Sequence, residues 1–287
     1  MSNYRHKIND KCAPLPLGKI ICVGRNFSEH ISELGNCFPE SPVLFLKPST
    51  SLVELDGQLK IDSSFGACHF ETELALLIGK ELKNCSEDEA MKAIIGIGLS
   101  LDLTYRDLQN KLKSEGLPWE KSKGFDGSCP TTNFISPNHF TNLNNIQFKL
   151  FINGKERQRG DSSAMIFRID EILCYASKYF SILPGDLVLT GTPFGVGALT
   201  SNDELRLEIP NLLNASAKVS FFKGKLYEVI DFVTHSETGE ELVLYRPLYG
   251  KFDLWVRPKA MFHEVVEING EKLLRFEFIK RSNDSNE

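Results

Sequence analysis

Cysteine is scarce in this sequence, and its arrangement excludes two common structural devices. The 287 residues include seven cysteines, an odd number, and no two of them form a Cys-x-x-Cys pair. Disulfide frameworks and zinc sites need paired or closely spaced cysteines. We therefore expect reduced thiols, no zinc site and a cytoplasmic location.

Two further absences argue against membrane and nucleic-acid roles. No segment approaches the roughly 18 consecutive apolar residues of a membrane span, and Met1–Pro14 is polar, unlike a secretory signal. The formal net charge is -5, whereas a protein that binds nucleic acid through its phosphates normally carries a basic excess. We expect neither a membrane nor a nucleic acid as a partner.

What remains is the composition of a folded globular protein rich in β-structure. Hydrophobic residues make up 41% and charged residues 25% of the chain, enough for one large core or a main domain with an appendage. Short apolar runs typical of strands recur between Gly, Pro or Asn residues. The runs in the first three-quarters of the chain are Lys19–Val23, Val43–Leu46, Glu73–Ile78, Leu99–Leu103, Phe148–Ile152, Leu187–Thr190 and Leu205–Ile209.

Helix signals are fewer. Ser86 and Glu89 fit a capping box, and we expect the helix that it starts to continue to Ile95. Apolar residues at 3.6-residue spacing from Ile169 to Phe180 predict a second helix. Because strands and helices do not alternate regularly, we expect a mixed, β-rich α+β fold rather than a doubly wound sheet or a barrel of βα units.

The character of the sequence changes near Phe221. Strand-like segments alternate with turn signals from there to Phe278. The last two segments flank Asn269-Gly270, a strong signal for a β-hairpin. We therefore divide the chain into a main domain, residues 1–217, and a small β-rich module, residues 218–287.

Three carboxylates suggest a metal site. Glu71 and Glu73 lie two residues apart at the start of an apolar run, so strand geometry would place both side chains on one face. Asp102 lies inside another apolar run, where an unpaired carboxylate is costly to bury. Three oxygen ligands without histidine or cysteine suit Mg²⁺ or Mn²⁺. The alternative is a solvated strand edge, with Asp102 paired to an arginine.

Short motifs follow one another in order between Cys22 and Gly197. They are Cys22–Glu33, Pro42–Pro48, His69–Glu73, Leu101–Asp107, Lys121–Asp126 and Leu189–Gly197. Together they resemble the signature blocks of the fumarylacetoacetate hydrolase family. The resemblance is closest to small members that act as acylpyruvate hydrolases and as oxaloacetate decarboxylases or tautomerases.

This resemblance implies a β roll with few helices, present as a homodimer that acts on a small 2-oxo acid. It implies one Mg²⁺ or Mn²⁺ ion on Glu71, Glu73 and Asp102. It places His30 and Glu33 on a short lid helix, where their i, i+3 spacing lets both face one site.

The resemblance also implies roles for four further residues. Lys123 matches a lysine that points at the substrate carbonyl group. Arg106, Gln109 and Thr192 match positions near the substrate carboxylate. These residues would bind and polarise the substrate beside the metal.

The implied chemistry is the stabilisation of an enolate. The metal would hold the charge that develops on the 2-oxo oxygen, and Lys123 would add positive charge there. Glu33, oriented through His30, would take a proton from the attacking water in hydrolysis. Such a site can hydrolyse acylpyruvates, decarboxylate oxaloacetate or tautomerise oxaloacetate, and the sequence leaves these three reactions open.

Two other functions stay open. On the same fold, the chain could be an isomerase or decarboxylase of catabolic dienoates. It could also be a catalytically inactive binding protein, an alternative weakened by the presence of every metal-binding and catalytic residue that the resemblance implies.

The C-terminal module resembles a small bacterial domain of unknown function, which suggests a bacterial source. Its Tyr245, Tyr249, Trp255 and Arg257 could line a ligand groove. Aromatic residues in a small β module more often form its core, and we expect that here.

Overall fold

The computed structural model divides the chain into two compact units, Met1–Phe222 and Lys223–Glu287. The expected boundary between residues 217 and 218 falls inside the last strand of the first unit, β17 (Leu213–Phe222). Among the described residues, no helix has the length and apolar character that a membrane span requires. The structure describes residues 4–33, 35, 37–222, 227–248, 251–268 and 271–276.

Strands dominate the first unit, and its helices are short. The strands before β17 are β1 (Lys7–Ile8), β2 (Lys11–Cys12), β3 (Ile20–Gly24), β4 (Val43–Lys47), β5 (Leu52–Glu54), β6 (Gly57–Asp62), β7 (Cys68–Phe70), β8 (Thr72–Ile78), β9 (Ile94–Leu101), β10 (Thr104–Tyr105), β11 (Cys129–Thr131), β12 (Gln147–Ile152), β13 (Lys155–Asp161), β14 (Leu187–Leu189), β15 (Gly197–Ala198) and β16 (Glu204–Ile209). The helices are α1 (Ser28–Glu33), α2 (Glu87–Ala93), α3 (Arg106–Ser114), α4 (Glu120–Lys123) and α5 (Ile169–Tyr179), with 3₁₀ turns η1 (Ser49–Ser51), η2 (Ser63–Phe65), η3 (Pro137–His139) and η4 (Ser162–Ala164).

The main sheet has seven strands in the order β4-β3-β14-β8-β9-β11-β5. Every residue of its central strand β8 is buried. Leu74 and Leu76 join one apolar cluster and Ala75 and Leu77 join a second, so both faces of β8 are covered. A strand covered on both faces reads as a continuous apolar run rather than an alternating one.

A second sheet has five strands in the order β13-β12-β16-β17-β6. In β12 and β16, buried apolar residues alternate with more exposed ones, which is typical of a sheet with one face on the core. Phe148 of β12 and Leu207 of β16 belong to the same apolar cluster as Leu74 of the main sheet. The strand-rich mixed α+β class with few helices, expected from the sequence, is therefore confirmed.

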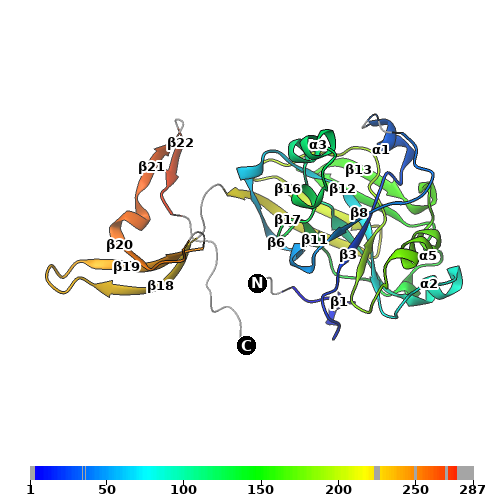
Figure 1. Ribbon diagram of the computed structural model, residues 1–287, viewed down its shortest axis with the longest axis horizontal. Helices are drawn as coiled ribbons and strands as arrows, with labels where there is room; N and C mark the ends of the chain where they lie inside the picture. The colour runs from blue at the N-terminus through cyan, green and yellow to red at the C-terminus, as the bar shows by residue number, and fades with distance from the viewer. Residues whose placement is uncertain are drawn as a thin grey trace. The chain divides into compact units, whose positions relative to one another are not determined.

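Helices α2 and α5 pack against each other beside these strands (Figure 1). The capping box of α2 is present, because Ser86 Oγ accepts from Glu89 N and Glu89 Oε2 accepts from Ser86 N. The helix ends at Ala93, so our expectation that it would reach Ile95 was wrong. Ile94 begins β9 and pairs with Ile78 of β8, and this strand pairing overrides the helical spacing of the apolar residues.

The second unit consists of a sheet in the order β18-β19-β20 and a separate antiparallel pair, β21 and β22. The predicted Asn269-Gly270 turn lies between β21 and β22 but outside the described residues. The elements are β18 (Tyr227–Thr234), β19 (Glu241–Pro247), β20 (Trp255–Pro258), η5 (Lys259–His263), β21 (Val265–Ile268) and β22 (Glu271–Leu274).

Tyr245 of β19 is the centre of an aromatic cluster in this unit. Its side chain is 1% exposed, and its ring lies 5.4 Å from Tyr227 and 5.7 Å from Phe262, both edge-on. Trp255 contacts the same ring at 6.0 Å but remains 42% exposed. Tyr245 is therefore a core residue of the module, while Tyr249 lies outside the described residues.

Candidate active site

Antiparallel pairing of β8 and β9 brings three carboxylates together. Glu71 directly precedes β8, Glu73 is the second residue of β8, and Asp102 directly follows β9. Thr72 pairs with Leu101, and the Asp102 N–H donates to the Glu71 carbonyl at 2.8 Å. One oxygen from each carboxylate lies within 4.8 Å of the others. The three residues are 5%, 2% and 1% exposed. A buried cluster of this kind excludes the alternative of a solvated strand edge.

Basic side chains surround two of the three carboxylates. Lys123 of α4 donates from Nζ to Glu71 Oε2 at 2.8 Å and to Asp102 Oδ2 at 2.6 Å. Arg106 forms an ion pair with Glu71, and Lys47 Nζ lies 2.8 Å from Asp102 Oδ1. Asp102 is thus paired with two lysines and not, as the alternative supposed, with an arginine.

In this cluster, neighbouring charges outweigh the effect of burial on the pKa values of Glu71 and Lys123. Burial raises the pKa of the Glu71 carboxyl, but Lys123 and Arg106 outweigh it and hold that pKa below its usual range. Burial lowers the pKa of the Lys123 ammonium, but Asp102 and Glu71 raise it above its usual value. Both groups are therefore charged near neutral pH.

Glu73 is the carboxylate without a basic partner. It accepts a hydrogen bond from Gly191 N–H at 2.6 Å, and within the described part of the chain it forms no ion pair. Burial raises its pKa well above the usual value, and Asp102 and Glu71 raise it further. The cluster therefore has an excess of negative charge around Glu73, and the all-oxygen donor set of Glu71, Glu73 and Asp102 fits a hard divalent cation.

Helix α1 carries His30 and Glu33 on one face. His30 Nδ1 lies 2.9 Å from Glu33 Oε2, and the Gly195 N–H donates to Glu33 Oε1 at 3.2 Å. His30 and the three carboxylates line one pocket. Glu33 does not line this pocket and contacts His30 instead. The i, i+3 spacing thus brings the two side chains into contact, but only His30 of the pair lines the pocket.

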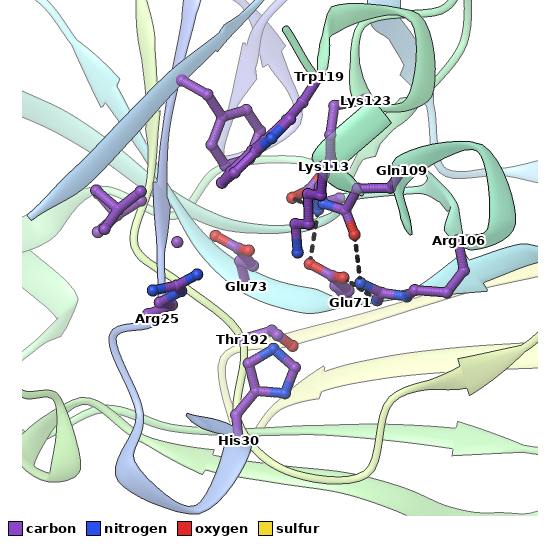
Figure 2. A pocket seen from close by; sticks show the side chains of 15 residues that line it. Arg25, His30, Glu71, Glu73, Arg106, Gln109, Lys113, Trp119, Lys123 and Thr192 are labelled. Atoms are coloured by element: carbon purple, nitrogen blue, oxygen red, sulfur yellow. Dashed lines mark hydrogen bonds and ion pairs between the residues drawn. The ribbon is translucent and has the colours of Figure 1, made fainter. Parts of the chain in front are cut away.

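The three residues expected near a substrate carboxylate also line this pocket (Figure 2). Arg106 Nη1 donates to Gln109 Oε1 at 2.8 Å, one turn along α3. Thr192 Oγ1 accepts from Gln158 Nε2 at 2.9 Å. All nine residues singled out from the sequence thus lie in or directly behind one pocket. They are His30, Glu33, Glu71, Glu73, Asp102, Arg106, Gln109, Lys123 and Thr192.

The pocket also contains side chains to which the sequence analysis gave no role. Arg25, in the turn between β3 and α1, has a φ of 59°, an uncommon conformation for a residue other than glycine. Lys113 Nζ lies 5.1 Å from the centre of the Trp119 ring. Burial lowers the pKa of Lys113, and Arg106 and Arg25 lower it further. Lys113 had a detectable signal, since it lies four residues after Gln109 and so on the same face of α3.

Two buried polar residues hold the site from behind. Lys47 is fully buried, and its Nζ donates to the carbonyls of Leu103 and Ser128 at 3.3 and 3.1 Å and to the Lys123 carbonyl. Gln158 of β13 accepts from Thr72 N at 2.9 Å and donates to the Pro193 carbonyl at 2.9 Å. Lys47 occurs in a recognised motif, whereas no local signal marks Gln158.

Known families match both parts of the chain. Residues 19–220 match a family model described as fumarylacetoacetate (FAA) hydrolase C-terminal. Residues 218–278 match one described as a protein of unknown function, DUF1653. Oxaloacetate tautomerase YcgM of Escherichia coli strain K12 is 50% identical over 191 residues, which cover 66% of this chain and 87% of that protein.

Solved structures agree with this match. Fumarylpyruvate hydrolase from Pseudomonas aeruginosa, in complex with Mn²⁺ and pyruvate, has a TM-score of 0.72 and 32% identity, covering 77% of this chain and 97% of that one. 2-Hydroxyhepta-2,4-diene-1,7-dioate isomerase from Mycobacterium marinum has a TM-score of 0.63 and 32% identity, covering 73% and 77%. The motifs, the strand-rich fold and the match over residues 19–220 lead to one conclusion: this chain belongs to the fumarylacetoacetate hydrolase family.

Proposed function

We propose that this protein forms the enolate of oxaloacetate with the help of a divalent metal, and so catalyses its keto–enol tautomerisation. The observation that carries the proposal is the buried cluster of Glu71, Glu73 and Asp102, which lines a pocket and in which Lys123 bridges Glu71 and Asp102. A likeness to oxaloacetate tautomerase YcgM supports the choice of substrate.

We assign the metal to the oxygens of Glu71, Glu73 and Asp102. Each carboxylate oxygen has more than one acceptor site, so the contacts with Lys123, Arg106 and Lys47 leave room for a metal bond. When bound, the dication would act as a Lewis acid on the 2-oxo group. We expect Mg²⁺ or Mn²⁺, and the Mn²⁺ in the fumarylpyruvate hydrolase complex supports that expectation.

Proton transfer falls to the pair on α1. For hydrolysis, we expected Glu33, oriented through His30, to take a proton from the attacking water. Of these two residues, His30 is the one that lines the pocket. We therefore propose that His30 Nε2 takes the proton from C3 of the keto form, while Glu33 holds Nδ1–H and stabilises the imidazolium. Return of that proton to the 2-oxo oxygen completes the tautomerisation.

The remaining pocket residues bind the substrate. The Lys123 ammonium adds positive charge beside the enolate oxygen, and its bonds to Glu71 and Asp102 hold it in place before the reaction. The Arg106 guanidinium, the Gln109 side-chain amide and the Thr192 hydroxyl supply donors for the substrate carboxylate next to the 2-oxo group. Gln158 keeps the Thr192 side chain oriented.

Hydrolysis of acylpyruvates is a second candidate function of the same site. It forms the same kind of enolate after water attacks the distal carbonyl, and the likeness to fumarylpyruvate hydrolase favours it. Decarboxylation of oxaloacetate gives the enolate of pyruvate. The dienoate isomerase stays a weaker alternative, supported by the similar structure from Mycobacterium marinum.

We further propose that the first unit carries the catalysis, because every residue that lines the pocket lies within residues 1–217, and that the unit beginning at Lys223, five residues later than we expected, is a separate module. We also propose a homodimer and a cytoplasmic location in a bacterium. The seven free cysteines support the location, and light scattering after gel filtration would test the dimer.

The test is an assay of enol–keto exchange of oxaloacetate, by ultraviolet absorbance, beside pyruvate release from oxaloacetate and from acetylpyruvate. Each is measured with Mg²⁺, with Mn²⁺ and with EDTA, for the wild type and Glu73→Ala. Metal-dependent exchange that the variant loses would support the proposal. Exchange no faster than the metal-only blank would refute it, and acetylpyruvate cleavage alone would favour the second candidate.

A further inference from the structure

Two cationic side chains in the pocket have no carboxylate partner. Within the part of the chain that the structure describes, neither the Arg25 guanidinium nor the Lys113 ammonium forms an ion pair, although both line the pocket. In Figure 2, Lys113 extends from α3 toward Glu71 and Glu73, and Arg25 lies beyond Glu73 on the other side. The pocket thus holds two positive groups that the proposed enolate chemistry does not use.

The balance of charge in the pocket favours an anionic ligand with two negative groups. Four cationic side chains and three carboxylates line it, which leaves one positive charge in excess when all three carboxylates are ionised. The divalent metal proposed above raises this excess to three. A substrate with a single carboxylate would leave two positive charges uncompensated, whereas a dicarboxylate leaves one. The four cations are Arg25, Arg106, Lys113 and Lys123, and the three carboxylates are Glu71, Glu73 and Asp102.

Helix α3 carries donor groups that are spaced along its axis and can contact the two ends of such a ligand. Arg106 and Gln109, proposed to bind the carboxylate beside the 2-oxo group, lie in the first turn of the helix. Lys113 follows Gln109 by four residues, about 6 Å along the helix axis. Side chains that start from successive turns on one helix face can therefore contact opposite ends of a short ligand. Trp119 limits the rotation of the Lys113 stem, because the ammonium lies over its ring.

We propose that Lys113 and Arg25 bind the distal carboxylate of the substrate and select four-carbon 2-oxo dicarboxylates over acylpyruvates whose acyl end is uncharged. This inference rests on the proposed function for the position of the proximal end of the substrate. Lys113 is the principal contact, since it shares a helix face with Gln109. Arg25 closes the opposite side.

Two stable ligands test the proposal without turnover. (S)-Malate and (S)-2-hydroxybutyrate share the 2-hydroxy acid end and differ only in a distal carboxylate against a methyl group. Calorimetric titration of the full chain with Mg²⁺ measures both affinities in the wild type, Lys113→Met, Lys113→Arg and Arg25→Gln. Lys111→Met is the matched control, because Lys111 is exposed on the same helix.

We expect malate to bind the wild type about tenfold more tightly than 2-hydroxybutyrate, the effect of one charge-assisted hydrogen bond. Lys113→Met should remove most of this preference by weakening malate alone, Arg25→Gln should reduce it, Lys113→Arg should restore it, and Lys111→Met should leave it unchanged. Equal weakening of both ligands, or no preference in the wild type, would overturn the proposal. A malate preference in a protein that turns over neither oxaloacetate nor acetylpyruvate would refute the proposed function and keep the subsite.

Discussion

Replacing the fully buried Lys47 with methionine should strongly destabilise the catalytic unit. Methionine keeps most of the volume but removes the donor group. Asp102 then loses one of its two lysine partners, and the carbonyls of Leu103 and Ser128 lose a fully buried donor. Breaking a buried ion pair costs about 3–5 kcal/mol, and an unsatisfied buried acceptor costs about 1–3 kcal/mol.

We expect a total loss of about 3–5 kcal/mol in the free energy of unfolding. Asp102 keeps Lys123 as a partner, so the lower end of the range for a broken ion pair applies, and the loss of the carbonyl contacts is added to it. For a unit of this size, each kcal/mol lowers the melting temperature by about 2–4 °C, so we expect a fall of roughly 6–20 °C. The same substitution should also weaken metal binding, since Asp102 would be less firmly held.

Tryptophan fluorescence during urea unfolding measures this loss of stability in the first unit of the chain. The chain has two tryptophans, so a Trp255→Phe background leaves Trp119 as the reporter of the first unit. The matched control is Lys92→Met in the same background, because Lys92 pairs with Asp88 on the surface, where both side chains are more than 70% exposed, and such a pair contributes at most about 1 kcal/mol. A loss for Lys47→Met no larger than that of the control would refute the reasoning.

Two further predictions concern buried polar groups. Gln158→Leu leaves Thr72 N–H without its acceptor and Thr192 without its donor. We expect the free energy of unfolding in urea to fall by about 1–3 kcal/mol. The KM for oxaloacetate should rise by a larger factor than kcat falls. A pure loss of stability with unchanged KM would contradict the positioning role of Gln158. Burial lowers the pKa of His6 from 6.5, so the folded state binds fewer protons than the unfolded state below pH 6.5, and stability should fall as the pH drops from 6.5 toward the folded pKa. His6→Gln should flatten this part of the stability curve, and an unchanged slope would exclude His6 as its source.

The sequence predicted part of the arrangement of these side chains because two local rules applied. Two-residue spacing brought Glu71 and Glu73 together, and i, i+3 spacing brought His30 to Glu33. Asp102 could be identified as costly to bury, but its contact with Glu71 depends on how β8 pairs with β9, which spacing along the chain does not reveal.

Two other features of the site could not be predicted from the sequence, each for its own reason. Lys113 was missed because α3 was not predicted; with that helix assigned, its spacing from Gln109 would have placed it in the pocket. Gln158 comes from the second sheet and reaches the site only through tertiary packing. Tertiary pairing also ends α2 at Ala93, because Ile94 must be extended to pair with β8.

The register of β8 against β9 also bears on how this family can vary. Because Thr72 pairs with Leu101, the contact between Glu71 and Asp102 depends on strand alignment and not on the number of residues that connect the two strands. Insertions or deletions in the connection around α2 should therefore be tolerated as long as β9 returns in the same alignment. A slip of one residue would instead turn the side chains of β9 to the opposite face and break up the carboxylate cluster.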